Sequence, residues 1–148
     1  MSDSTNADDR HGTIRTSSDI VYRTGPSALP ADAFIALATR VWPRDYDAVR
    51  VAEALTRSLN VGAWCGDRLV GSVRVLSDGS LFNTIPEIMV DPEFQRQGIG
   101  RTLMRKALGL ARGGRVFFGA LPGNEPFFEG IGFRRGPIGF VGRVEDMS

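Results

Sequence analysis

Apolar and polar positions alternate along the chain with two different periods, which predict where strands and helices lie. An apolar residue at every second position is typical of a strand, and apolar residues three and four apart are typical of a helix. Strands are predicted over Asp19–Arg23, Val61–Cys65, Arg68–Leu76, Leu81–Val90, Val116–Leu121 and Gly139–Val144. Helices are predicted from Leu29 to Val41, from Asp45 to Leu59, from Gly100 to Ala111 and around Glu125 to Gly130. The predicted order is therefore β-α-α-β-β-β-α-β-α-β.

Turn residues support several of these boundaries. Pro43 ends the first helix, because proline lacks the N–H that continues a helix. The Gly66-Asp67 pair joins two strands as a tight hairpin, and Gly113-Gly114 stops the long helix. The apolar residues of the second helix are expected to point inward: Val49, Val51, Ala52, Ala54 and Leu55.

Length and composition predict one folded domain with a single core, because the chain has 148 residues of which 42% are hydrophobic. Residues 1–17 are rich in Ser, Thr, Asp and Asn and have almost nothing apolar to bury. We therefore expect a disordered tail over residues 1–17 and a single domain over residues 18–148.

Several kinds of chemistry are disfavoured because Cys65 is the only cysteine and His11 is the only histidine. One cysteine forms no internal disulfide, and a histidine in a polar tail supports neither a Ser-His-Asp triad nor a usual zinc site. We therefore expect no metal. No apolar run reaches the length of a membrane span, and the start of the sequence lacks the pattern of a signal peptide. The chain is expected to be cytoplasmic and to have no membrane partner.

The stretch Val90–Leu103, which reads VDPEFQRQGIGRTL, carries the strongest functional signal. Gly98 and Gly100 stand where the apolar pattern changes from strand-like to helix-like. The first N–H groups of a helix have no partner inside it and lie at the positive end of the helix dipole. A strand, turn, glycine and helix in this order therefore predict an anion site, although the glycines could also serve a tight turn alone.

The spacing of the glycines separates this loop from two nucleotide-binding motifs. A dinucleotide fingerprint needs a third glycine at position 103, which is Leu, and a Walker loop needs Gly-Lys-Ser/Thr, whereas Gly100 precedes Arg101. No acid lies between Phe94 and Asn124, but this stretch holds six basic residues. A basic helix suits a phosphorylated ligand, and it can equally be a solvated face. Nucleic acid is not expected as a partner, since the pI is only about 8.0.

The loop Gln95-x-x-Gly98-x-Gly100 after Val90-Asp91-Pro92 resembles the acyl-CoA signature of the GNAT superfamily of N-acetyltransferases. A later segment, Pro122–Phe133, is similar to the family's "N...FY...GF" segment. The resemblance covers residues 60 to 143. It implies an α/β (α+β) GNAT fold with a mixed central sheet of about six strands and flanking helices. It also implies acetyl-CoA as co-substrate and a direct transfer of the acetyl group to an amine, without a covalent intermediate.

The resemblance implies a set of acetyl-CoA-binding residues. The glycine loop would wrap the pyrophosphate, and the strand before it would hold the pantetheine arm in a gap between two strands. Pro86 lies within this strand, where it marks a bulge or an unpaired edge or only shortens the strand. The implied binding residues are Ile88, Met89, Val90, Gln95, Arg96, Gln97, Gly98, Ile99, Gly100, Arg101, Asn124 and Phe128. Asn124 can alternatively be a helix cap.

The catalytic groups are less well defined by the sequence. The amine must lose a proton before it attacks, and Glu87 is the first candidate for the base, with Glu129 in reserve. Glu87 could also be a solvated strand carboxylate, and the sequence leaves open which face of the strand meets the amine. A backbone N–H near Met89 or Val90 is implied as the donor to the oxyanion. Phe128 departs from the family, because many relatives carry there a tyrosine whose hydroxyl protonates the leaving thiolate.

The acceptor is expected to be a small-molecule amine or a peptide amine. The resemblance implies an acceptor pocket near Trp42 and Tyr46, which could form an aromatic rim, although Trp42 could instead fill the core. The sequence leaves a homodimer open. Two alternatives remain: a catalytically silent acyl-CoA-binding module, in keeping with Phe128, and a protein that uses its basic helix for interaction only.

Overall fold

The computed structural model describes residues 19–147, which form two compact units, the first extending to Val116 and the second beginning at Phe117. The elements of the first unit are β1 (Ile20–Thr24), α1 (Ala31–Val41), α2 (Ala48–Thr56), β2 (Leu59–Cys65), β3 (Arg68–Ser77), β4 (Phe82–Thr84), β5 (Ile88–Val90), the 3-10 turn η3 (Pro92–Phe94) and α3 (Ile99–Leu110). A short strand, β6 (Arg115–Phe117), spans the boundary. The second unit holds α4 (Glu125–Ile131) and the 3-10 turn η4 (Val144–Asp146).

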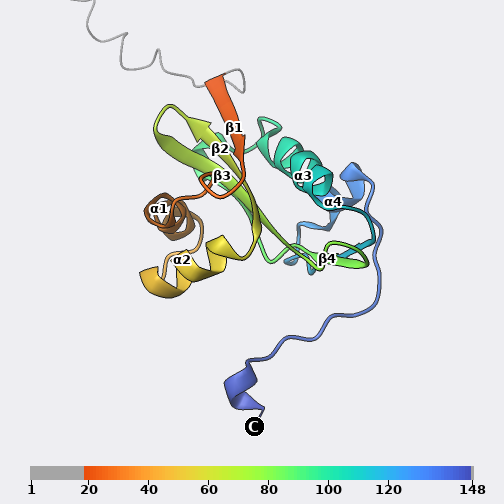
Figure 1. Cartoon of the computed structure of the whole chain (residues 1–148). Helices are drawn as coiled ribbons and strands as arrows, with labels where there is room; N and C mark the ends of the chain where they lie inside the picture. The colour runs from red at the N-terminus through yellow and green to blue at the C-terminus, as the bar shows by residue number, and fades with distance from the viewer. Residues whose placement is uncertain (1–18, 148) are drawn as a thin grey trace, which may run out of the picture. The chain divides into compact units, whose positions relative to one another are not determined.

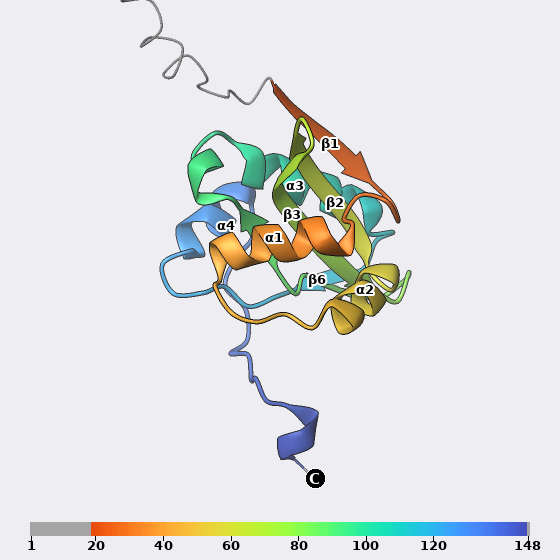
Figure 2. The same cartoon turned by 90° about the vertical axis from the view of Figure 1, so that its left-hand side faces the viewer.

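The strands form a six-stranded sheet in the order β1-β2-β3-β4-β6, with β5 also paired to β3. The ladders β1–β2, β2–β3, β3–β4 and β3–β5 are antiparallel. Helices α1 and α2 lie on one face of this sheet and α3 lies on the other (Figures 1 and 2). The predicted α/β class, with a sheet of about six strands and flanking helices, is therefore confirmed.

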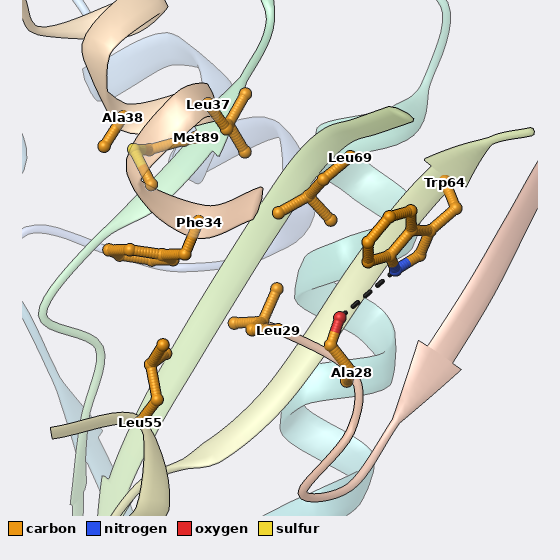
Figure 3. Packing of buried hydrophobic residues seen from close by; sticks show 9 residues of the cluster. All are labelled: Ala28, Leu29, Phe34, Leu37, Ala38, Leu55, Trp64, Leu69 and Met89. Carbon is orange, nitrogen blue, oxygen red and sulfur yellow. Dashed lines mark hydrogen bonds between the residues drawn. The ribbon is translucent and has the colours of Figure 1, made fainter. Parts of the chain in front are cut away.

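Each face of the sheet has its own apolar contacts. On the α1 face, Trp64 of β2 donates a hydrogen bond from its indole nitrogen to the carbonyl oxygen of Ala28, at 3.1 Å. Figure 3 shows the buried cluster around this contact: Ala28, Leu29, Phe34, Leu37, Ala38, Leu55, Trp64, Leu69 and Met89. On the other face, α3 lies so close to β3 that a Cβ at Gly71 would come within 3.0 Å of Leu103 and 3.1 Å of Ile99.

The hairpin between β2 and β3 has the turn that the sequence predicts. Cys65 pairs with Arg68, and Gly66 has a φ of +61°, a conformation that glycine adopts without steric cost. Cys65 is buried at the end of β2, as expected for a small hydrophobic side chain.

The sequence predicts one strand over Leu81–Val90, but the structure has two short strands there, β4 and β5, so the prediction of a continuous strand was wrong. Thr84 of β4 lies opposite Leu76, and Ile88 of β5 lies opposite Val73. Residues 85–87 are therefore three residues facing the two residues 74 and 75 of β3, which is a β-bulge. Pro86 lies in this bulge, because proline has no N–H to donate to a ladder.

Helix α2 is shorter than predicted and buries less. It begins at Ala48 because the Asp47 carboxylate caps it, accepting from the amides of Val49 (3.0 Å) and Arg50 (3.1 Å). Val49 is 71% exposed, so the prediction that it points inward was wrong. The same prediction was wrong for Ala52 and Ala54, whereas Leu55 is buried and Val51 is partly buried. A helix of nine residues against a sheet buries one narrow stripe, and the predicted face was wider than that stripe.

In the second unit, aromatic rings gather around Phe128 on α4. The ring centroid of Phe118 lies 4.7 Å from that of Phe128 and 5.0 Å from that of Phe133. The predicted strand Gly139–Val144 is not formed: this segment has no ladder in the described residues, and Phe140 is 95% exposed. Alternation alone does not make a strand, since a strand needs a partner for its backbone groups.

Two further points concern the N-terminal residues and the crossing of a membrane. The predicted disordered tail, residues 1–17, lies outside the described residues. Within residues 19–147, no helix combines the length and the apolar character that crossing a membrane requires.

Candidate active site

The two edges of β5 carry different backbone groups, and the hydrogen bonds to β3 identify them. The amide of Asp91 donates to the carbonyl of Val70 (2.8 Å), and the carbonyl of Glu87 accepts from the amide of Arg74 (3.4 Å). Backbone groups of successive strand residues point to opposite edges, so residues 87, 89 and 91 face β3. The N–H groups of Ile88 and Val90 therefore point to the other edge, where β5 has no ladder in residues 19–147.

The side chains of β5 divide between the two faces of the sheet. Met89 belongs to the buried cluster on the α1 face, as Figure 3 shows. Side chains alternate along a strand, so Glu87 shares the α1 face, and Ile88 and Val90 face α3. The structure thus places Glu87 on the face of the sheet that α1 covers.

After β5 the chain turns at Asp91, whose side chain is 1% exposed. One carboxylate oxygen accepts from Nε of Arg40 (2.6 Å) and from a guanidinium nitrogen of Arg68 (2.7 Å). The other oxygen caps η3 by accepting from the amide of Glu93 (2.9 Å). Burial by itself would raise the pKa of Asp91, but these hydrogen bonds from Glu93, Arg68 and Arg40 outweigh it and hold that pKa below its usual value.

The loop between η3 and α3 is fixed by local contacts. Nε2 of Gln95 donates to the carbonyl of Val90 at 3.1 Å, which brings the loop back over the end of β5. Arg96 has a φ of +63° and is the one non-glycine residue with a positive φ among residues 19–147. Gly98, the N-cap of α3, also lies in the left-handed region, with a φ of +82°. A Cβ built on Gly98 meets nothing within 4 Å, so the space beside the loop is open.

The N-terminus of α3 has the properties of an anion site. The first hydrogen bond of the helical type, from residue i to residue i−4, joins the amide of Thr102 to the carbonyl of Gly98 at 3.1 Å. The amides of Ile99, Gly100 and Arg101 precede it and have no carbonyl four residues earlier within the helix. The first turn holds no acid, and the exposed basic side chains near it include Arg96, Arg101 and Arg105. The side-chain oxygen of Gln97 is buried without a partner. The amides without a helical partner and the basic side chains fit a phosphorylated ligand, whereas the Gln97 oxygen is an acceptor and adds nothing to the binding of an anion.

On the α1 face, Glu87 forms an ion pair with Arg74 of β3. Nε of Arg74 contacts Oε1 of Glu87, and a second guanidinium nitrogen lies 2.9 Å from Oε2. The two side chains are 16% and 14% exposed, and the Arg74 guanidinium lies 6.0 Å from the ring centre of Phe34 on α1. Glu87 is therefore a largely buried carboxylate with a fixed orientation, so the alternative of a solvated strand carboxylate was wrong.

The connection between α1 and α2 places its two aromatic residues differently. The hydroxyl of Tyr46 donates to the carbonyl of Trp42 at 2.8 Å, and Tyr46 packs against the buried cluster. Trp42 is 38% exposed, so the interpretation that it fills the core was wrong. Trp42, the C-cap of α1, is therefore accessible to solvent.

The second unit holds the remaining candidates. Asn124 stands at the N-cap position of α4, but its side chain makes no capping hydrogen bond. Phe128 is 9% exposed and packs edge-on against Phe118 and Phe127. Glu129, the reserve base, pairs with Arg135 at 3.1 Å.

Sequence reasoning missed Asp91, Arg40, Arg68 and Arg74. The Asp91-Pro92 pair resembles a helix cap and could have indicated a turn. Nothing local could have revealed its main partner, because Arg40 and Asp91 are 51 residues apart in the sequence.

The comparisons with known proteins agree with this geometry. A model of the GNAT acetyltransferase domain matches residues 32–137. The N-alpha-acetyltransferase RimI of Mycobacterium tuberculosis is 36% identical over 81 residues, which is 51% of this chain and 51% of that protein. The chloroplastic GCN5-related N-acetyltransferase 2 of Arabidopsis thaliana is 35% identical over 78 residues, which is 51% of this chain and 30% of that protein. The match thus spans about half or less of these curated relatives.

Solved structures extend the match to most of the chain. A protein of Deinococcus radiodurans R1 classified as an acetyltransferase superposes with a TM-score of 0.76 and 26% identity, covering 88% of this chain and 93% of that one. The predicted GNAT fold is therefore confirmed. Because the family model covers most of the sequence and the fold agrees, the chain belongs to the GNAT acetyltransferase family, a family of acyltransferase enzymes.

Proposed function

We propose that this chain transfers the acetyl group of acetyl-CoA directly to the primary amine of a small molecule or to an amino terminus. One observation carries the proposal. The unladdered edge of β5, which is the edge with no strand paired to it in residues 19–147, leads through a loop with open space beside it to the first amides of α3, which have no partner within the helix. In a member of the GNAT family, this combination suits a ligand that has peptide-like amides at one end and phosphates at the other.

The loop Gln95–Arg101 would bind the pyrophosphate. The amides of Ile99, Gly100 and Arg101 supply unused donors, and Arg96 and Arg101 supply positive charge. The unladdered edge of β5 would bind the pantetheine amides as an added strand does, through the peptide groups of Ile88 and Val90. The carbonyl of Val90 already accepts from Gln95, so the free groups are the two N–H groups and the Ile88 carbonyl.

Glu87 would accept the proton of the amine through a water molecule. An alkylamine with a pKa of about 10.4 is mostly protonated at neutral pH and must be deprotonated before it attacks. Arg74 engages both oxygens of Glu87, yet a carboxylate has about four lone-pair sites and can still accept from a water. Arg74 would then act as a positioning residue that orients the base.

Of the two N–H groups on the unladdered edge of β5, that of Val90 lies nearer the loop and would bind the pantetheine, so the donor to the oxyanion would be the N–H of Ile88. The sequence pointed to the neighbourhood of Met89 or Val90, but the N–H of Met89 is directed at β3. An N–H held rigidly in a strand loses little freedom when charge develops beside it, which is the basis of oxyanion stabilisation.

Transfer would proceed without an acetylated enzyme. Cys65 is buried at the end of β2, paired across the ladder with Arg68, and not on the loop or on β5. We expect Cys65→Ala to keep its turnover, and intact-mass spectrometry after incubation with acetyl-CoA to find no acetylated Cys65. A trapped thioester at this residue together with loss of activity would refute direct transfer.

A second candidate, a catalytically silent acyl-CoA-binding module, is favoured by two observations. Both oxygens of Glu87 are engaged by Arg74, and Phe128 has no hydroxyl to protonate a leaving thiolate. The same loop would bind acetyl-CoA in this case, but no amine would release CoA.

One experiment separates these functions. Acetyl-CoA is titrated calorimetrically, and thiol release is then measured against a panel of polyamines, amino acids, aminoglycosides and peptides with free amino termini. Peptides belong in the panel because one relative is named an N-alpha-acetyltransferase. Binding with thiol release supports the enzyme, and binding without release from any amine supports the silent module. Absence of binding would refute both.

A further inference from the structure

We propose that Asp91, Arg40 and Arg68, here called the Asp91 clamp, position the loop Gln95–Arg101 for its ligand. The inference rests on the proposed function, because it takes this loop to be the acetyl-CoA site. None of the three side chains needs to touch the ligand. They would act by fixing the point and direction in which the chain leaves β5.

The clamp joins three elements that are far apart in the sequence. Arg40 belongs to the last turn of α1, Arg68 is the first residue of β3, and Asp91 follows β5. Arg40 bonds Asp91 through Nε at 2.6 Å and the carbonyl of Leu69 through a second nitrogen at 2.8 Å. The end of α1, the start of β3 and the start of the loop are therefore locked together at a single carboxylate.

Every hydrogen-bonding group of Asp91 is used. Its amide donates to the carbonyl of Val70, and its own carbonyl accepts from the amide of Phe94, each at 2.8 Å. Its carboxylate holds both arginines and the amide of Glu93. Arg68 also lies over the ring of the buried Phe94, with 5.6 Å between the guanidinium carbon and the ring centre. The clamp therefore fixes the chain at both ends of η3, directly before Gln95.

A buried carboxylate paired with two arginines adds little to the free energy of unfolding, so we infer that the Asp91 clamp serves to position the loop. Removing a carboxylate from water costs free energy that the attraction to its partners largely offsets, so apolar side chains often serve as well in such a place. A carboxylate with fixed partners does supply direction. A change of about 1 Å in how a binding group is placed is enough to weaken binding strongly.

The central test is Asp91→Asn, which keeps the shape of the side chain and removes its charge. Two measurements are made at a temperature at which all variants are folded: amide hydrogen exchange of residues 94–101 without ligand, and the Kd for acetyl-CoA by calorimetry. We expect exchange in this segment to become at least about tenfold faster and the Kd to rise by about tenfold.

Two controls separate positioning from loss of charge or stability. Glu93→Gln removes the exposed carboxylate that lies 3.4 Å from Arg68, outside the clamp. Asp78→Ala removes the carboxylate that accepts from the amides of Ser80, Leu81 and Phe82 at a different turn, which lowers stability without touching the loop. Both controls should keep the exchange of residues 94–101 and the Kd within about twofold of the parent protein.

A second pair of variants covers the case in which Asp91→Asn does not fold. The Arg40 side chain is about one third exposed, so its replacement is milder. Arg40→Gln should raise the Kd by several-fold, and Arg40→Lys, which keeps the charge, should restore part of the loss.

The outcomes are distinguishable from failure of the proposed function. If the parent protein does not bind acetyl-CoA, the proposed function fails, and the exchange measurement still decides about the clamp. Unchanged exchange of residues 94–101 in folded Asp91→Asn or Arg40→Gln overturns the clamp whether or not acetyl-CoA binds. Faster exchange with an unchanged Kd also overturns it, because the loop would then not depend on the clamp for binding.

Discussion

The two faces of the sheet present chemistry of different kinds around β5. On the α3 side, the groups that we propose for acetyl-CoA belong to the main chain: the edge of β5, the loop after η3 and the first amides of α3. On the α1 side, the groups are side chains that meet from separate segments, with Arg74 from β3, Glu87 from the bulge and Phe34 from α1. The first site is thus set by backbone conformation, and the second by which side chains the fold brings together.

This difference predicts different sensitivities to substitution. A backbone site is damaged by anything that fills the space before it or changes its conformation, and it tolerates many changes of side-chain type nearby. A side-chain site is damaged by loss of one group and is easily rebuilt for another ligand. Under the proposed function, the α3 side would bind acetyl-CoA through its main chain, and the α1 side would meet the acceptor through its side chains.

The largest effect is expected from Gly100→Asp in the first turn of α3. The new carboxylate would occupy the space at the unpartnered amides and repel the pyrophosphate, so the Kd for acetyl-CoA should rise by about 100-fold or more. Helical structure should persist, since an acid in the first turn favours a helix. The matched control is Gly109→Asp, an exposed glycine of the same helix with nothing within 4 Å of a built Cβ, which should leave the Kd unchanged. A folded Gly100→Asp protein with the parent Kd would contradict the backbone site.

The second prediction concerns the α1 face. Glu87→Gln should lower kcat by about 100-fold with an accepted amine, because general-base catalysis contributes at least that much, and the Kd for acetyl-CoA should not change. Arg74→Lys, which keeps a cation but not the two-pronged contact, should lower kcat less. Steady-state kinetics and calorimetry on both variants make the comparison. Full activity of Glu87→Gln would remove Glu87 from the reaction.

The third prediction uses the lowered pKa of Asp91. A carboxyl group whose pKa is lower in the folded state contributes stability above its unfolded pKa, near about 3.9, and loses it as the pH falls through the folded value. The free energy of unfolding of the parent should therefore exceed that of Asp91→Asn by about 1 to 3 kcal/mol at neutral pH, since the partners are partly exposed. This difference should shrink below about pH 4. Denaturant unfolding at several pH values measures it, and a difference that grows on acidification would reverse the assigned sign.

The smallest effect is expected at Arg96. Its φ of +63° is unfavourable for any residue with a Cβ, so Arg96→Gly should raise the free energy of unfolding by about 0.5 to 1 kcal/mol. Acetyl-CoA should bind a few-fold more weakly, because one positive charge leaves the site. Arg112→Gly is the control: Arg112 is exposed and has no positive φ, so glycine there should lower stability. A loss of stability in Arg96→Gly would show that its side chain contributes more than its backbone costs.

The glycine turn before α3 and the start of this helix could be predicted from the sequence because their determinants are local. Gly98 has the positive φ that a residue with a Cβ avoids, and the change of apolar period marks the start of α3 within a residue of the prediction. The segments that were predicted wrongly depend on partners. Gly139–Val144 alternates as a strand does but has no ladder, and Val49 belongs to an apolar run that is wider than the buried stripe of α2.

The sequence by itself determined the family, the hairpin at Gly66-Asp67 and the glycine turn that begins α3, because each depends on preferences set by neighbouring residues. Tertiary structure alone decided which face of β5 carries Glu87, that Arg74 holds it, and that Arg40 reaches Asp91 across 51 residues. Such contacts follow from strand register and helix packing, and a shift of one residue in register would move every side chain of β5 to the other face.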